Sequence, residues 1–114
     1  MAGYKINRVQ SDIKLMLSQL LREVKDPRVS KLLSIVKVDV SGDLSYATVY
    51  VSAIEGAEAT ETSVKALNKS AAGFLRRELG AALSLRKVPE LRFAADHSIE
   101  KSAEISKIID SFDK

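Results

Sequence analysis

The stretch LSIVKVDVSGDLSYATVYVSA, residues 33–53, decides the fold of this 114-residue chain. Its first part alternates apolar and polar residues, which predicts a strand over residues 33–40 with one inward face. That face is predicted to hold Val36, Val38 and Val40. The turn-forming residues SGDLS separate this strand from a second predicted strand at residues 46–53. Because the connection is short, the two strands are expected to form an antiparallel hairpin.

A helix precedes the hairpin. Apolar residues recur at helical spacing over residues 6–24, from Ile6 to Val24. The sequence KDPR at residues 25–28 ends this helix, because Pro27 disfavours helical geometry at the residue before it.

Two helices and a third strand follow the hairpin. Thr60 or Thr62 is predicted to cap a helix that ends near Ala72. The next helix places Leu75, Leu79 and Leu83 inward. Pro89 ends it, and a strand is predicted at residues 91–95.

The predicted order is therefore αββααβ, followed by a C-terminal helical tail. This order indicates an α+β fold in which helices pack on one face of a three-stranded sheet. We assign residues 1–98 to one domain and residues 99–114 to the tail.

Ala71, Ala72 and Gly73 lie where the two central helices meet. Glycine permits a sharp change of direction, and alanine lets a backbone or a ligand approach closely. These small residues predict a kinked helix pair whose bend contacts a phosphate backbone. Tight packing at the bend is the simpler alternative.

Composition narrows the class of protein. The chain has no cysteine, and its N-terminus lacks the apolar core of a secretory signal, so we expect a monomeric cytoplasmic protein away from membranes. With one histidine, His97, no cofactor, metal site or catalytic residues are predicted. In the sequence Asp96-His97-Ser98, Asp96 or Ser98 is better explained as a helix cap than as part of a triad.

The net charge of +3 is unevenly distributed. Residues 1–37 carry eight basic and three acidic residues, whereas residues 38–64 carry five acidic and no basic ones. Residues 65–92 carry seven basic and two acidic residues. If the two basic blocks meet in space, they form one positive face that attracts polyanions.

Four motifs in this order resemble the bacterial ribosome-binding factor A family over about residues 4–109. They are KDPR, the hairpin sequence VDVSGDLSYATVYVS, the helix-pair sequence AAGFLRRELG, and LRKVPELRFAADHSIE. The resemblance implies a type II KH-like fold in which an Ala-x-Gly kink replaces the usual Gly-x-x-Gly loop. Ala71-Ala72-Gly73 matches that kink. Clamping of four nucleotides in the usual KH manner is therefore not expected, and recognition through shape and backbone takes its place.

The resemblance also implies a function. It predicts an assembly factor that binds the free 30S subunit and assists maturation of 16S ribosomal RNA, including processing near its 5′ end, with a role in the cold. The predicted partners are 16S ribosomal RNA within that subunit and other assembly factors. The predicted RNA-binding residues are Arg8, Lys25, Arg28, Lys65, Lys69, Arg76, Arg77, Arg86 and Lys87.

Several roles stay open at this point. Arg28 either orders its turn together with Asp26 or contacts RNA. Tyr46 and Tyr50 share a strand face, where core packing or partial exposure is favoured over base stacking, and Phe74 is expected in the core. The competing functional class is a protein–protein adaptor in ribosome biogenesis that does not bind RNA directly.

Overall fold

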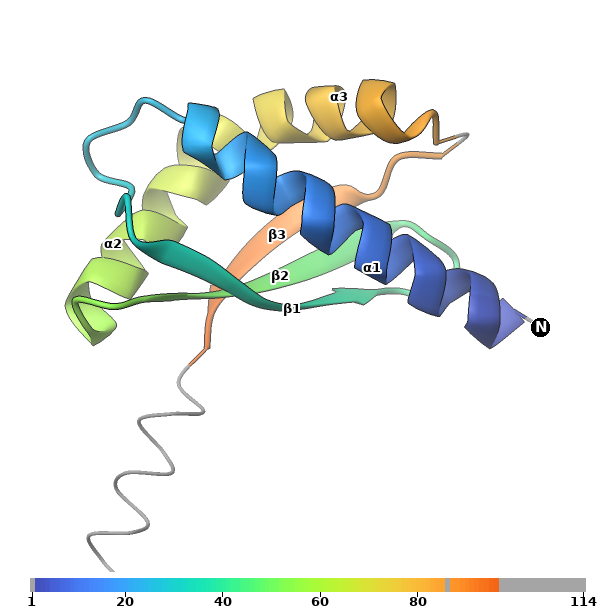
Figure 1. Cartoon of the computed structure of the whole chain (residues 1–114), viewed down its shortest axis with the longest axis horizontal. Coiled ribbons are helices and arrows are strands. Elements are labelled where there is room, and N and C mark those ends of the chain that lie inside the picture. Colours follow the sequence, from blue (N-terminus) through green and yellow to red (C-terminus); the bar gives the residue numbers. More distant parts are fainter. Residues whose placement is uncertain (1, 86, 97–114) are drawn as a thin grey trace, which may run out of the picture.

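The predicted hairpin is present in the computed structural model of the chain, which describes residues 2–85 and 87–96. Strand β1, Leu33–Val40, pairs antiparallel with strand β2, Tyr46–Ala53. Strand β3, Glu90–Ala95, pairs parallel with β2, so the sheet order is β1-β2-β3. A parallel neighbour needs a crossover connection, which the two helices between β2 and β3 provide (Figure 1).

The helices confirm the predicted order αββααβ. Helix α1 spans Ala2–Leu20 and is extended by a 3₁₀ turn at Leu21–Glu23. The central pair consists of α2, Ala57–Ala66, a π-helical turn at Leu67–Ala71, and α3, Ala72–Leu83. Figure 1 shows the chain changing direction between α2 and α3.

The helices pack on one face of the sheet. Along β2, Ala47, Val49, Val51 and Ala53 are buried, and the residues between them are at least partly exposed. Helix α1 contacts β1, α2 contacts β2 and β3, and α3 contacts both β3 and α1. The core between these layers is apolar, and each fully buried leucine contributes roughly 1.5–3 kcal/mol. Its fully buried leucines are Leu17, Leu67, Leu75 and Leu79.

The prediction that Val36 faces the core is wrong. The register passes from the Ile35–Val51 pair to the Lys37–Tyr50 pair, so Val36 has no partner on β2. Such a β-bulge inserts one extra residue and reverses the alternation before it. Ile35 therefore takes the buried position, and Val36 is 39% exposed.

The predicted threonine cap of the second helix is also wrong. Helix α2 begins at Ala57, so Thr60 lies inside it and is buried. Thr60 Oγ1 donates to Gly56 O at 2.8 Å and accepts the Ala53 N–H at 2.9 Å. The hydroxyl therefore ties α2 to the end of β2.

The C-terminal helical tail, the domain boundary at residue 98 and the roles of Arg86, His97 and Ser98 lie outside the described residues. They stay predictions.

Candidate nucleic-acid interface

The bend between the central helices comes from the π-helical turn and not from Gly73. Gly73 lies in α3, and Gly56 is the described glycine that has a positive φ. In the turn itself, Ser70 Oγ donates to Ala66 O at 3.0 Å. Serine bonding of this kind, to the carbonyl four residues earlier, often bends helices. The irregular turn therefore lies at Leu67–Ala71, next to the predicted position, and the role of Ala71-Ala72-Gly73 as a kink motif stays a prediction.

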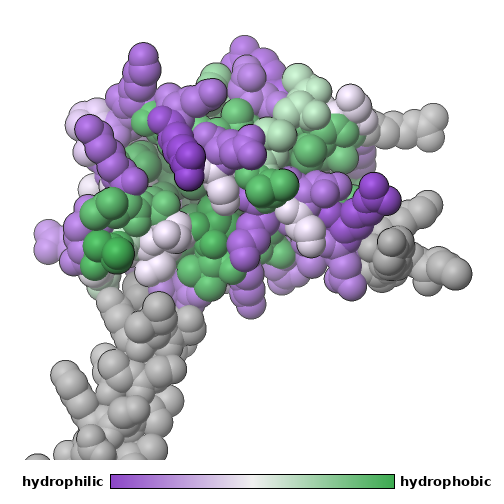
Figure 2. Space-filling model, viewed as in Figure 1, coloured by the Kyte–Doolittle hydropathy of each residue, from purple (hydrophilic) through white to green (hydrophobic). Residues whose placement is uncertain are grey.

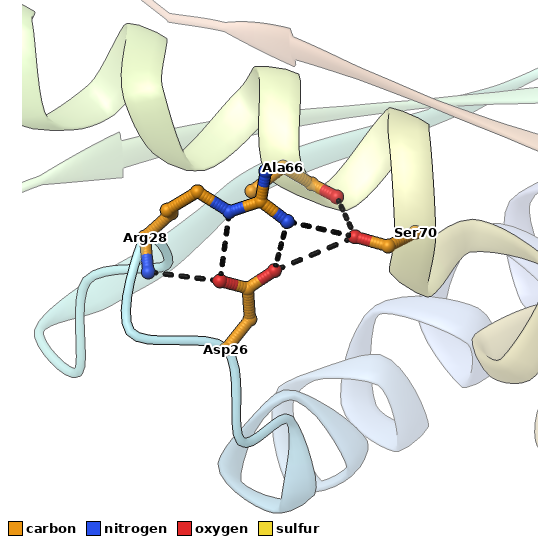
Figure 3. Close-up of polar contacts among 4 residues, drawn as sticks. All are labelled: Asp26, Arg28, Ala66 and Ser70. Carbon is orange, nitrogen blue, oxygen red and sulfur yellow. Dashed lines mark hydrogen bonds and ion pairs between the residues drawn. The ribbon is translucent and has the colours of Figure 1, made fainter.

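The KDPR segment packs against this bend (Figure 3). Asp26 accepts three hydrogen bonds from Arg28, with the shortest at 2.7 Å between Asp26 Oδ2 and Arg28 Nη2. Arg28 Nη2 also donates to Ser70 Oγ at 3.3 Å, and Ser70 Oγ lies 3.4 Å from Asp26 Oδ2. The turn-ordering role predicted for Arg28 is therefore present.

The same contacts perturb the Asp26 carboxyl group. Side-chain and backbone hydrogen bonds from Arg28 lower its pKa from 3.8 to about 2. These donors stabilise the carboxylate more than the neutral acid. Asp26 is therefore an anion at neutral pH and fixes Arg28 in one orientation.

Asn68 attaches the π-helical turn to the edge of the sheet. Its Nδ2 donates to Phe93 O at 2.9 Å, and its Oδ1 accepts the Phe93 N–H at 2.9 Å. A side-chain amide thus replaces the neighbouring strand that β3 lacks on that side. This contact was missed in the sequence, where Asn68 has only the spacing of an outward-facing residue.

The two glycines of α3 serve different purposes. At Gly80, α3 closely approaches Val88 in the segment before β3. A Cβ atom at Gly80 would lie 2.6 Å from Val88 Cγ2, so this close approach requires glycine. A Cβ atom at Gly73 would meet nothing within 4 Å. Gly73 therefore leaves open space on the surface and is not required by the packing of the described residues.

Gly73 lines the larger of two open grooves beside the bend. We call it the Arg77 groove, and its volume is about 880 Å³. Its walls include Tyr46, Gly73, Arg76, Arg77, Gly80 and Lys87. Small residues of α3 thus alternate with cationic ones along this groove, which fits the approach of a sugar-phosphate backbone.

The second groove lies between the end of the π-helical turn, the start of α3 and the segment that follows α1. We call it the Phe74 groove; it has a volume of about 580 Å³ and is formed by residues 23–28 together with Ser70, Ala71 and Phe74. The prediction that Phe74 lies in the core is wrong, because this side chain is 37% exposed. Leu75 is the buried residue here, on the inward stripe that helical spacing predicts, so its neighbour Phe74 turns outward.

The predicted RNA-binding residues fall into two groups. Arg28, Arg76 and Lys87 are engaged within the protein: Arg76 Nη2 donates to Val88 O at 2.9 Å, and Lys87 Nζ donates to Asp43 O at 3.1 Å. Five others are exposed and make no hydrogen bond or ion pair within the described part of the chain. These are Arg8, Lys25, Lys65, Lys69 and Arg77.

The exposed cations do not all gather at the bend. Lys25 and Arg77 each line one of the grooves, and Lys69 lies in the π-helical turn beside them. Arg8 lies twelve residues before the end of α1, which corresponds to about 18 Å along the helix. The two basic blocks therefore meet at the bend through Lys25, Lys69 and Arg77.

The sequence matches a known family. The family described as "Ribosome-binding factor A" matches residues 5–109. The chain belongs to the ribosome-binding factor A family. A ribosome-binding factor A from Acetivibrio thermocellus is 48% identical over 92% of this chain and 85% of its own length. One from Clostridium botulinum is 40% identical over 97% of this chain and 92% of its own length.

Solved structures of the family share this fold. The solution structure of a Thermotoga maritima ribosome-binding factor A matches with a TM-score of 0.74 and 35% identity, over 86% of this chain and 92% of that one. The crystal structure from Thermus thermophilus matches with a TM-score of 0.69 and 28% identity, over 79% and 94%. A homology model of the Thermus protein, fitted into a cryo-electron microscopy map of a 30S complex, matches with a TM-score of 0.64.

In this member of the ribosome-binding factor A family, the open face of the sheet carries Tyr50 and Tyr46, and Tyr46 also lines the Arg77 groove. Tyr46 is 41% exposed, and Arg92 Cζ lies 3.9 Å from the centre of its ring. Lys37 Nζ lies 4.8 Å from the centre of the Tyr50 ring. The partial exposure favoured for both tyrosines is thus confirmed, and cations already cover their rings.

Two further observations concern the described residues alone. Among them, no group of three or more histidine, aspartate or glutamate side chains is placed to hold a metal ion. No described helix combines the length and apolar character that crossing a membrane requires.

Proposed function

We propose that this protein binds the free small ribosomal subunit and assists the maturation of its 16S ribosomal RNA, including processing near the 5′ end, with a role at low temperature. Membership of the ribosome-binding factor A family supports the association with the ribosome. The Thermus relative is described in a 30S complex, which supports the small subunit as the partner.

The observation that carries the RNA-binding role is the meeting of unpaired cations at the bend. Lys25, Lys69 and Arg77 surround a turn whose neighbouring residues are small. Lysine and arginine side chains bind phosphates and release counterions, which supplies affinity that does not depend on sequence. Acidic residues also line the grooves: Glu23 and Asp26, the latter paired with Arg28, line the Phe74 groove, and Glu90 lines the Arg77 groove.

No reactive group is needed for this function. An RNA that can adopt two arrangements shifts toward the one that a protein binds more tightly. A rigid bend of fixed shape, carrying phosphate-binding groups on both sides, discriminates between such arrangements through their backbone geometry. The protein is therefore proposed to act as a selective binder of one RNA conformation.

Co-sedimentation with purified small subunits tests this proposal. We expect the protein to pellet with small subunits and not with large subunits or assembled ribosomes, and to dissociate steeply as salt rises from 50 to 200 mM. Equal binding to all three particles would contradict the proposal. In cells lacking the protein, 16S precursors extended at the 5′ end should accumulate, most strongly in the cold.

One observation favours the adaptor alternative. Leu32 and Ile54 are 55% and 83% exposed, and they flank the Leu33–Ala53 pair at one end of the hairpin. Figure 2 shows apolar surface interspersed with hydrophilic surface on the face that α1 crosses. The adaptor function predicts salt-tolerant binding to a protein in RNA-free extract, which Ile54→Asp abolishes.

A further inference from the structure

The Phe74 groove combines an exposed aromatic ring with a fixed guanidinium group. Phe74 forms one wall, and Arg28 lies in the opposite segment, residues 23–28. Arg28 stays half-exposed, with 51% of its side chain accessible, although its Nε and Nη2 atoms are bonded to Asp26. The groove therefore offers two flat groups of the kind on which nucleobases stack.

The contacts of Arg28 hold its plane in place before any ligand binds. Asp26 accepts from the Arg28 backbone N–H at 2.9 Å and from its Nε at 3.0 Å, which fixes the guanidinium group relative to the Arg28 backbone. Ser70 Oγ adds a contact from the π-helical turn. A rigid group loses less conformational entropy on binding, so such preorganisation favours affinity.

Charge distinguishes between a nucleotide and an apolar peptide as the occupant. The lining carries two acidic residues, Glu23 and Asp26, and two basic ones, Lys25 and Arg28. The Asp26–Arg28 pair is neutral as a unit, and Lys25 makes no hydrogen bond or ion pair among the described residues. Lys69, also exposed, adjoins Ser70 on the other wall. This charged lining does not suit an apolar peptide, whereas Phe74 and the Arg28 guanidinium offer flat surfaces for a base, and Lys25 and Lys69 offer cations for its phosphate.

We propose that the Phe74 groove binds one unpaired nucleotide of the RNA, with its base stacked on Phe74 and its phosphate near Lys25. A volume of about 580 Å³ lies within the range of sites that hold small organic groups. This inference rests on the proposed function, because the nucleotide belongs to the RNA that the protein binds. It adds a base contact to the phosphate contacts of the Arg77 groove.

Photo-crosslinking from position 74 identifies the occupant. Replacing Phe74 with p-benzoylphenylalanine in the full chain and irradiating the complex with purified small subunits should give a crosslink to an unpaired nucleotide of 16S ribosomal RNA. The same replacement at Leu15, an exposed position on α1 that lines neither groove, is the control and should not give that crosslink.

The outcomes separate the two proposals. If the wild-type protein does not co-sediment with small subunits, both fail. If it co-sediments but position 74 crosslinks to a ribosomal protein, or to nothing, the nucleotide site is wrong while the proposed function stands.

Affinity and its salt dependence give a second measurement. Phe74→Leu keeps an apolar side chain but removes the ring, so affinity for the small subunit should fall roughly 5- to 100-fold, the range for losing one base stack. The slope of log affinity against log salt should not change, because stacking releases no counterion. Phe74→Tyr should recover most of the lost affinity. A Phe74→Leu variant that is folded and binds as well as wild type overturns the proposal.

Discussion

The Arg77 groove and the Phe74 groove share one helical segment but differ in their opposite walls. The Arg77 groove faces Tyr46 and Lys87 and is lined by small and cationic residues of α3. One wall of the Phe74 groove is the KDPR segment, in which Arg28 pairs with Asp26. The helical segment from Ser70 to Ala81 thus borders one groove lined by small and cationic residues and another that contains an exposed aromatic ring.

The comparison shows that a count of positive charges overstates the cations available for binding. Arg76 and Lys87 line the Arg77 groove but donate to protein carbonyl groups, and Arg28 is paired with Asp26. In each groove one cation without a protein partner remains among the described residues, Arg77 and Lys25 respectively. These two positions are where charge reversal should matter most.

The largest expected effect is a loss of affinity for the small subunit when the charge of Arg77 is reversed. Arg77→Glu should lower affinity for the small subunit about 10- to 100-fold, because a charge-assisted contact is lost and a repulsion is added. The salt slope should also fall by about one, which distinguishes a phosphate contact from stacking. The measurement is co-sedimentation across a salt series.

Lys14→Glu is the matched control, since it changes the net charge equally on an exposed part of α1 outside both grooves. If the two variants lose affinity equally, the attraction comes from net charge and the groove has no special role.

Asn68→Ala tests whether the hydrogen bonds between Asn68 and Phe93 keep the helical turn beside both grooves in place. Losing both hydrogen bonds to Phe93 should lower the free energy of unfolding by about 1–3 kcal/mol, as measured in urea. Because Asn68 holds the turn between the grooves, the crosslink from position 74 should weaken as well. Asn7→Ala, at an exposed position on α1, should change neither.

Gly73→Ala separates stability from binding at the Arg77 groove. Alanine is the better helix former, and its Cβ meets no atom of the protein within 4 Å, so the free energy of unfolding should rise by about 0.5–1 kcal/mol. The same methyl group enters the groove and should lower affinity a few-fold. Gly42→Ala is a control in the hairpin turn, where a Cβ also meets nothing within 4 Å. Unchanged or increased affinity of Gly73→Ala would remove Gly73 from the interface.

The smallest expected effect is on the pH dependence of stability. It concerns one aspartate near each groove, Asp26 and Asp43. Asp26 orders the Phe74 groove, and hydrogen bonds from Ser41 and Ser45 lower the pKa of Asp43 to about 2, in the turn that holds Lys87. Each pKa is lower in the folded state than its ordinary value of 3.8. Both groups therefore stabilise the fold above pH 4, and this contribution disappears as the pH falls toward 2.

Asp26→Asn and Asp43→Asn should each make thermal stability less dependent on pH between 4 and 2. A variant whose melting temperature still falls as steeply as that of wild type over this interval would show that its carboxyl group has an ordinary pKa.

The sequence alone determined the order of the elements and most of the core. The strand at 33–40, the short turn and the strand at 46–53 follow from alternation and local turn chemistry, which act over a few residues. The inward positions of Leu67, Leu75 and Leu79 follow from helical spacing. The site of the bend was predicted from its small residues.

Only the tertiary structure decided which apolar residues face outward and which charged side chains are paired within the protein. A bulge at Val36 inserts an extra residue, so Val36 faces outward against the expected alternation, and Phe74, expected in the core, is exposed beside the buried Leu75. Whether Arg28, Arg76 and Arg77 are paired depends on carbonyl and carboxylate groups that the folded chain brings beside them. Local sequence fixes periodicity, whereas contacts between distant segments fix which side chains remain available to bind.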